Sequence, residues 1–274
     1  MKIKLVFITL LSVLLFGFTQ YKNNVLETPL EAVLVVGNTE DGTASSIKDM
    51  NKLALIFQKN GIKITKFYNR NTNWEAIKMA AKTSSFFVYS GHGSNMGIYG
   101  NTGGLCLNKM ISTKQILKEL QLKKNAIVLF KSVCGGAGSS ASDSKDIGIE
   151  EATTRVTDYA QPFFTIGAGC YYADNYEGGI DKFLISFLAG NTIEECYEAT
   201  TNPDYIHREI SKPFELDKKK MISICSDKND GINTQYQFIN GKAVITKIPS
   251  FKNYDIACVA NPCFSIDDLI VSKN

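Results

Sequence analysis

The feature that most constrains the fold is a regular alternation of short apolar runs with segments of helical periodicity. Continuous apolar runs at 32–36, 86–90 and 126–130 are typical of strands buried on both faces of a parallel sheet. Residues 62–68 alternate as a further strand, and the run 163–166 predicts a fifth. Segments with apolar residues at helical spacing lie between these runs, at 45–61, 72–81, 112–120, 149–159, 180–190 and from 192 onward.

This order of elements predicts an α/β fold in which a mostly parallel sheet is covered by helices on both faces, a three-layer arrangement. The capping-box patterns Thr72-x-x-Glu75, Ser112-x-x-Gln115 and Thr192-x-x-Glu195 predict where three of the helices begin. Ser45 or Ser46 is expected to cap the first helix. We therefore expect one large α/β domain over residues 31–212.

The residue pattern of the chain changes at about Pro213. Beyond this point short strand-like runs alternate with turn residues, and Asn240-Gly241 is typical of a hairpin turn. Residues 213–274 are therefore expected to form a small β-rich C-terminal extension. Two arrangements are open for it, a separate β appendage or extra strands at the edge of the main sheet.

The first residues have the pattern of an export signal. Lys2 and Lys4 precede an apolar run at 5–18 that is short for a membrane span. Small residues at the end of this run permit cleavage before Gln20, so that 1–19 is a signal peptide and 20–30 a linker. A secreted or periplasmic protein with no stable membrane span after cleavage is expected, and an uncleaved membrane anchor is the alternative.

Charge and cysteine usage exclude several classes of partner. The formal net charge is +3, which gives no basic surface of the kind that binds nucleic acid. The seven cysteines contain no Cys-x-x-Cys pair, and the chain has only two histidines, so we expect no metal site and no cofactor. An odd number of cysteines in an exported chain leaves at least one thiol unpaired, while Cys258 and Cys263 are spaced to close a small disulfide loop.

Chemically active side chains follow three successive predicted strands. His92 follows the strand 86–90, Cys134 follows the strand 126–130, and Asp174 follows the strand 163–166. Loops at the carboxyl ends of parallel strands converge at one rim of the sheet, where ligands bind in open α/β folds. The three side chains are therefore expected to lie near one another.

A cysteine beside a histidine is the arrangement of nucleophilic catalysis by a thiolate, because the imidazole tunes the thiol and protonates the leaving amine. Gly93 leaves the backbone accessible, so the N–H groups of Gly93 and Cys134 are candidates for an oxyanion hole. The alternative is that Cys134 is a buried core residue and His92 a turn residue. Cys170 is the thiol that competes with Cys134 for the rim position.

Two motifs resemble the caspase-like cysteine peptidases of clan CD. They are Phe86-Phe-Val-Tyr-Ser-Gly-His92-Gly93 and Ala126-Ile-Val-Leu-Phe-Lys-Ser-Val-Cys134-Gly135, each an apolar strand that ends in a catalytic residue of that family. The chain is most similar to the CHAT and gingipain-like branches, which also have a Gly-Leu-x-Leu turn, here Gly104-Leu-Cys-Leu107, and a helix between the motifs. The resemblance covers about 31–200. Gly135 departs from the family, in which many members have a polar residue.

The resemblance implies an exported cysteine endopeptidase that hydrolyses protein or peptide substrates with a Cys134/His92 dyad and needs no third catalytic residue. In CHAT and separase-like enzymes acidic residues near Asp174 help to bind a basic side chain, which implies Asp174, with Glu177 as the reserve, for cleavage after Arg or Lys. Asp174 as a helix cap is the alternative. A catalytically inactive binding or scaffold protein of the same fold, or a flavodoxin-like ligand binder, are the other functions considered. The sequence makes no prediction of oligomeric state.

Overall fold

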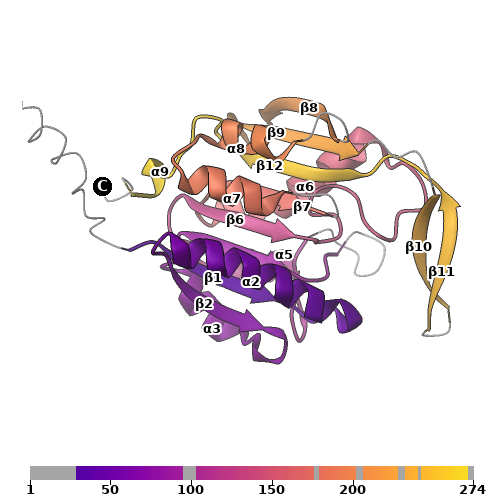
Figure 1. Cartoon of the computed structure of the whole chain (residues 1–274), viewed down its shortest axis with the longest axis horizontal. Helices are drawn as coiled ribbons and strands as arrows, with labels where there is room; N and C mark the ends of the chain where they lie inside the picture. Colours follow the sequence, from indigo (N-terminus) through magenta and orange to yellow (C-terminus); the bar gives the residue numbers. More distant parts are fainter. Residues whose placement is uncertain are drawn as a thin grey trace, which may run out of the picture.

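The structure is a computed structural model that describes residues 29–94, 103–175, 179–201, 206–227, 232–239 and 242–270. Its centre is an eight-stranded sheet in the order β2-β1-β3-β6-β7-β12-β9-β8 (Figure 1). The first five of these strands run parallel, and each of the last three is antiparallel to the strand before it. The strands are β1 (Glu31–Val36), β2 (Lys63–Tyr68), β3 (Phe86–Ser90), β6 (Ala126–Lys131), β7 (Ala168–Asp174), β8 (Ile206–Phe214), β9 (Asp217–Asp227) and β12 (Tyr254–Ala260).

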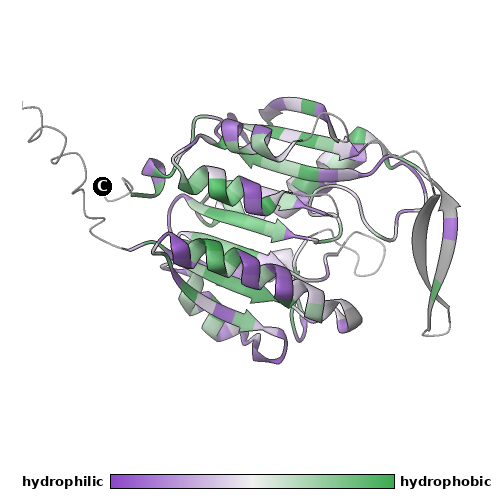
Figure 2. Cartoon of the chain, viewed as in Figure 1, coloured by the Kyte–Doolittle hydropathy of each residue, from purple (hydrophilic) through white to green (hydrophobic). Residues whose placement is uncertain are grey.

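Helices cover both faces of the sheet, which confirms the α/β, mostly parallel, three-layer architecture. Buried residues of α3, α5 and α6 belong to the apolar cluster on one face, and those of α2, α7 and α8 to the cluster on the other. Figure 2 shows hydrophobic strands in the centre and hydrophilic residues on the outer parts of the helices. The helices are α2 (Thr43–Lys59), α3 (Trp74–Ala81), α5 (Thr113–Glu119), α6 (Gly148–Thr165), α7 (Ile180–Leu188), α8 (Ile193–Thr200) and α9 (Asp267–Ile270).

The prediction of a strand at 163–166 is wrong. These residues lie in the last turn of α6 and just after it, and the strand is β7, five residues further along. A short apolar run fits a buried helix as well as a buried strand, and only tertiary packing separates the two. Phe163 is buried on the α3, α5 and α6 side of the sheet, where its ring lies 5.4 Å from that of Phe130.

The C-terminal strands belong to the main sheet. β12 pairs with β7, all of its residues are buried, and β9 and β8 follow it outward. Of the two arrangements left open for 213–274, the structure has extra strands in the sheet, and the expected boundary at 212 falls inside β8. A separate hairpin, β10 (Ile232–Ile239) with β11 (Lys242–Pro249), stands at the end toward which the parallel strands point (Figure 1). Its turn at Asn240-Gly241 lies outside the described residues.

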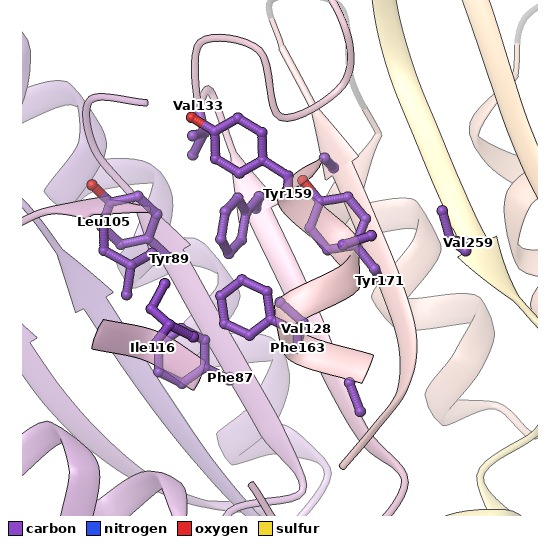
Figure 3. Close-up of a cluster of buried hydrophobic side chains, with 14 of the residues drawn as sticks. Phe87, Tyr89, Leu105, Ile116, Val128, Val133, Tyr159, Phe163, Tyr171 and Val259 are labelled. Carbon is purple, nitrogen blue, oxygen red and sulfur yellow. The ribbon is translucent and has the colours of Figure 1, made fainter. Parts of the chain in front are cut away.

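Phe130, near the end of β6, is the centre of an aromatic cluster that supports the carboxyl rim of the sheet. Its ring lies 5.4 Å from Tyr89 of β3, 5.9 Å from Tyr159 of α6 and 5.4 Å from Tyr171 of β7, each edge to face. This geometry is favourable for aromatic pairs. The three tyrosines are buried, and their hydroxyl groups reach the loops that follow the strands (Figure 3). The buried tyrosines therefore hold these loops in place at the carboxyl end of the sheet.

The cysteines of the described residues are all free thiols, and the disulfide loop that the spacing of Cys258 and Cys263 permits is not formed. Within the described part of the chain, no helix has the length and hydropathy that a membrane span requires. The signal peptide expected at 1–19 lies outside the described residues.

Candidate active site

His92 lies in the loop that leaves the carboxyl end of β3. The buried hydroxyl of Tyr89 donates a hydrogen bond to the carbonyl oxygen of His92 at 2.9 Å. The same hydroxyl accepts the N–H of Cys106 at 2.9 Å, so the loop is tied to the short strand β4 (Leu105–Cys106). A side chain at Gly91 would place its Cβ 2.4 Å from the Tyr89 hydroxyl, which explains the glycine there. The His92 side chain itself is exposed.

Cys134 lies in a tight turn that follows β6. The N–H of Gly136 donates to the carbonyl of Val133 at 2.8 Å, and Gly135 has φ 79° at the third position of this turn. A turn of this kind requires a residue at positive φ, and glycine adopts it without steric cost. The departure of Gly135 from the family pattern thus has a local structural reason. Cys134 itself is partly exposed.

The two loops are in direct contact. The hydroxyl of Tyr159, on α6, lies 3.1 Å from the carbonyl oxygen of Ser94 and 3.0 Å from that of Cys134, where it donates a hydrogen bond shared between the two loops. A Cβ added to Gly93 would lie 2.1 Å from the Cys134 carbonyl oxygen. The backbone beside His92 therefore packs against the backbone of Cys134, and the structure brings these two predicted residues to one place on the rim.

Two backbone N–H groups at this contact have no hydrogen-bond acceptor among the described residues. The carbonyl of His92 is bonded to Tyr89, and because every described peptide bond is trans, the N–H of Gly93 points away from the core. The carbonyl of Val133 is bonded inside its turn, which likewise turns the Cys134 N–H outward. Within the described residues, neither N–H has an acceptor. The oxyanion-hole assignment of these two groups stays a prediction.

A small hollow opens beside Cys134. It encloses about 230 Å³, including the part open to solvent, and its lining residues are Ser132, Cys134, Ser139, Ala141 and Asn175. Ser132 has φ 55°, which is uncommon for a residue other than glycine, and its N–H donates to the carbonyl of Asp174 at 2.8 Å. Strained backbone of this kind concentrates at functional sites.

Asp174 lies at the end of β7 with its side chain completely buried. One carboxylate oxygen accepts the N–H of Ile180 at 2.9 Å, at the start of α7, and the other lies 3.1 Å from the ammonium of Lys131. The first contact is the one that the helix-cap alternative describes. A basic side chain of a substrate would have to displace Lys131 to reach this carboxylate. Glu177, the reserve candidate, lies outside the described residues.

Burial raises the pKa of the Asp174 carboxyl from 3.8 to about 6, although Lys131 and the N–H of Ile180 partly oppose this rise. The folded protein therefore binds this proton more tightly than the unfolded chain does. The resulting stabilisation is complete below about pH 4 and is lost as the pH rises through about 6, with a magnitude of about 3 kcal/mol. Asp174→Asn removes this titration.

We therefore expect the unfolding free energy of Asp174→Asn to rise relative to wild type by up to about 3 kcal/mol between pH 4 and pH 7. Urea denaturation of both proteins at several pH values in this interval measures the difference. A difference that is constant with pH would show that Asp174 does not titrate in this way.

Cys170 does not compete with Cys134 for the rim. It lies within β7, is completely buried, and its pKa is raised well above the usual value by burial and by the neighbouring Cys258. A protonated, enclosed thiol is inert as a nucleophile. The placement of Cys170 near the rim depended on the incorrect strand at 163–166 and is wrong.

Sequence reasoning missed four residues that build the site: Tyr89, Tyr159, Ser139 and Asn175. Tyr159 was assigned only to a helical segment, because nothing in the sequence indicates that α6 passes beneath both loops. Asn175 directly follows Asp174, and a polar residue at a strand end was the signal that could have found it.

Comparison with known proteins adds no assignment. No protein-family model matches this chain, and no curated protein matches it either. Among the described residues, no group of three or more His, Cys, Asp or Glu side chains is placed to hold a metal ion.

Proposed function

We propose that the protein is an exported cysteine endopeptidase of caspase-like fold, with Cys134 as nucleophile and His92 as its acid–base partner. The observation that carries the proposal is the contact of the two loops, in which Gly93 beside His92 packs on the carbonyl of Cys134. The alternation of strands and helices, with both residues at the rim of parallel strands, is the arrangement that the family resemblance leads us to expect.

The arrangement supports a thiolate mechanism. His92 takes the proton of the Cys134 thiol, the sulfur attacks the carbonyl carbon of a peptide bond, and the carbonyl oxygen takes up the negative charge. The N–H groups of Gly93 and Cys134 donate to this oxygen. His92 transfers its proton to the departing amine, which leaves a thioester on Cys134. Water then attacks the thioester and gives a proton to His92, the acid product leaves, and His92 returns the proton to the sulfur of Cys134.

The other described thiols are less suited to this chemistry. Cys170, Cys196, Cys225 and Cys258 are buried. Cys106 is half-buried, and burial raises its pKa. Cys263 is exposed, but it follows β12, which runs antiparallel to β7. Cys263 therefore lies toward the amino ends of the parallel strands, and Cys134 lies at their carboxyl ends. Cys134 is also partly exposed, and its turn packs against Gly93, the residue after His92.

The substrate is proposed to be a polypeptide outside the cytoplasm. The charged and apolar pattern of 1–19 supports export, and Cys134 is partly exposed. The family resemblance suggests cleavage after Arg or Lys, with Asp174 and Glu177 as binding residues. The complete burial of Asp174 does not favour that preference.

Hydrolysis of an unfolded protein tests the proposal. We would incubate the mature protein, residues 20–274, with unfolded casein at about pH 7 under reducing conditions and follow the release of new amino groups. Wild type and Cys263→Ala, which removes an exposed thiol far from the site, are both expected to cleave it. No cleavage of casein or of a mixed-sequence peptide library by either protein would contradict the proposal and favour a binding or scaffold role.

A further inference from the structure

The hollow beside Cys134 is lined entirely by uncharged residues. We propose that it receives a small, uncharged polar side chain, a carboxamide or a hydroxyl, of the substrate residue that precedes the scissile bond. The inference rests on the proposed function, because it assigns the hollow to the residue whose carbonyl Cys134 attacks. It replaces the preference for Arg or Lys that the family resemblance implies.

Asn175 supplies an unpaired acceptor in the hollow. Its side-chain nitrogen donates to the carbonyl of Ser139 at 3.1 Å and to that of Tyr254 at 3.4 Å, and its residue is 4% exposed. Because the side-chain nitrogen donates to two carbonyl groups, the orientation of the amide is determined. The side-chain oxygen of Asn175 then has no part in these two hydrogen bonds. No described group donates to this oxygen. An acceptor without a partner among the described residues can bond to a ligand that brings a donor.

Ser139 supplies a donor on the same wall. Its hydroxyl oxygen accepts the N–H of Tyr254 at 2.7 Å, which leaves the hydroxyl proton for another acceptor. A side chain with one donor and one acceptor can therefore bond to Asn175 and Ser139 together. Carboxamides and hydroxyl groups have this combination, whereas an aliphatic side chain would leave the Asn175 oxygen unpaired.

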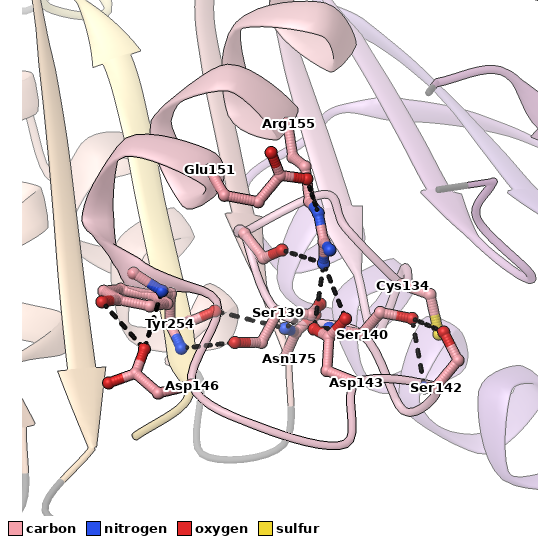
Figure 4. Close-up of polar contacts among 12 residues, drawn as sticks. Cys134, Ser139, Ser140, Ser142, Asp143, Asp146, Glu151, Arg155, Asn175 and Tyr254 are labelled. Atoms are coloured by element: carbon pink, nitrogen blue, oxygen red, sulfur yellow. Dashed lines mark hydrogen bonds and ion pairs between the residues drawn. The ribbon is translucent and has the colours of Figure 1, made fainter. Parts of the chain in front are cut away.

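Two carboxylates that are close in the chain to lining residues already have cationic partners. The carboxylate of Asp174, the residue before Asn175, is paired with Lys131. In the loop that lines the hollow, Asp143 lies 2.9 Å from the guanidinium of Arg155 and accepts the N–H of Ser140 at 2.7 Å (Figure 4). A charged substrate side chain entering the hollow would lose its hydration without meeting a free counter-charge among these residues, and this is unfavourable.

Hydrogen bonds within the protein hold the loop that contains Ser139 in place without a ligand. Arg155, which is buried in α6, donates to the carbonyl of Gly138 at 3.2 Å and holds Asp143 in the following loop (Figure 4). The N–H of Ser139 donates to the carbonyl of Tyr254 at 3.2 Å, which attaches the same loop to β12. The hollow is therefore small and preformed, and it favours side chains of the size of Ser or Asn.

Peptide substrates that differ only in the residue before the scissile bond test the inference. We would compare Asn, Ser, Leu, Arg, Lys and Asp at this position and measure kcat/KM with the mature protein. Asn and Ser are expected to exceed Leu, Arg, Lys and Asp by about tenfold or more, the ratio typical of one buried hydrogen bond that is made or lost. A preference for Leu, Arg, Lys or Asp would overturn the inference.

Added charge gives a second, independent readout. Asn175→Asp, which follows β7, and Ala141→Asp, in the loop that lines the hollow, are each expected to raise the ratio of Arg to Asn cleavage by roughly ten- to a hundredfold. Ser144→Asp adds the same charge to the same loop at an exposed position outside the lining, and it should leave the ratio unchanged. Equal ratios in all three variants would overturn the inference. Failure to cleave any substrate would instead contradict the proposed function.

Discussion

Replacing Cys134 with alanine is expected to lower kcat/KM for peptide hydrolysis by at least about a thousandfold, because the variant has no atom that can form the acyl intermediate. His92→Ala should lose activity to a similar extent, since the leaving amine then departs without a proton donor. The double variant should lose little more than either single variant, because the two residues act as a unit.

Initial rates on the best peptide substrate, with circular dichroism to confirm folding, measure these effects. Both side chains lie on rim loops and not in the core, so the fold should persist. Cys263→Ala is the matched control, and it should retain wild-type activity. Activity of Cys134→Ala above one per cent of wild type would contradict the assignment of the nucleophile.

The second large effect is expected from Gly93→Ala. The added Cβ would lie 2.1 Å from the Cys134 carbonyl oxygen, 2.4 Å from the Tyr159 hydroxyl and 2.8 Å from Val133. The first of these atoms is backbone, so the two loops must separate. Displacement of catalytic groups by about 1 Å costs on the order of a hundredfold in rate, and we expect kcat/KM to fall by at least this factor.

Gly42→Ala is the control for this experiment. Gly42 precedes α2, and the nearest atom to an added Cβ is the Thr39 hydroxyl oxygen at 3.2 Å, so a small adjustment is sufficient. Both variants should be compared with wild type in kcat/KM and in urea unfolding. Wild-type activity in Gly93→Ala would show that the two loops do not need this contact.

Local patterns predicted much of the architecture because their cause is local. The runs at 32–36, 86–90 and 126–130 are the strands β1, β3 and β6, each within a residue of its predicted bounds. The capping boxes at Ser112 and Thr192 are both formed, with reciprocal hydrogen bonds to Gln115 and Glu195. In these cases a few neighbouring residues determine the backbone.

Predictions failed where several local solutions compete. The expected box at Thr72 and Glu75 is not formed; Asn73 caps α3 by accepting the N–H of Ala76, and Thr72 donates to Asn69 instead. The first helix begins at Thr43, ahead of the expected caps Ser45 and Ser46. Adjacent polar residues can each satisfy the free N–H groups of a helix start, so the pattern indicates the helix but not the cap.

Of the candidate site, only the reactive residues could be predicted from the sequence, and the residues that position them could not. The order of strands indicated that His92 and Cys134 follow neighbouring strands, and the sheet order has β3 beside β6. The hydroxyl of Tyr159 that joins the two loops, and the bonds that attach Ser139 to Tyr254 across more than a hundred residues, depend on tertiary packing. No periodicity in the sequence contains this information.

The most direct test is the site of covalent labelling by a peptide acyloxymethyl ketone. A catalytic thiolate displaces the carboxylate of the acyloxy group and forms a thioether with the methylene carbon, and a spectator thiol does not. Peptide mapping by mass spectrometry identifies the labelled cysteine among the seven in the chain. The account predicts a single adduct on Cys134 that is absent in Cys134→Ala and strongly reduced in His92→Ala. An adduct on Cys106 or Cys263, or labelling that does not depend on His92, would contradict it.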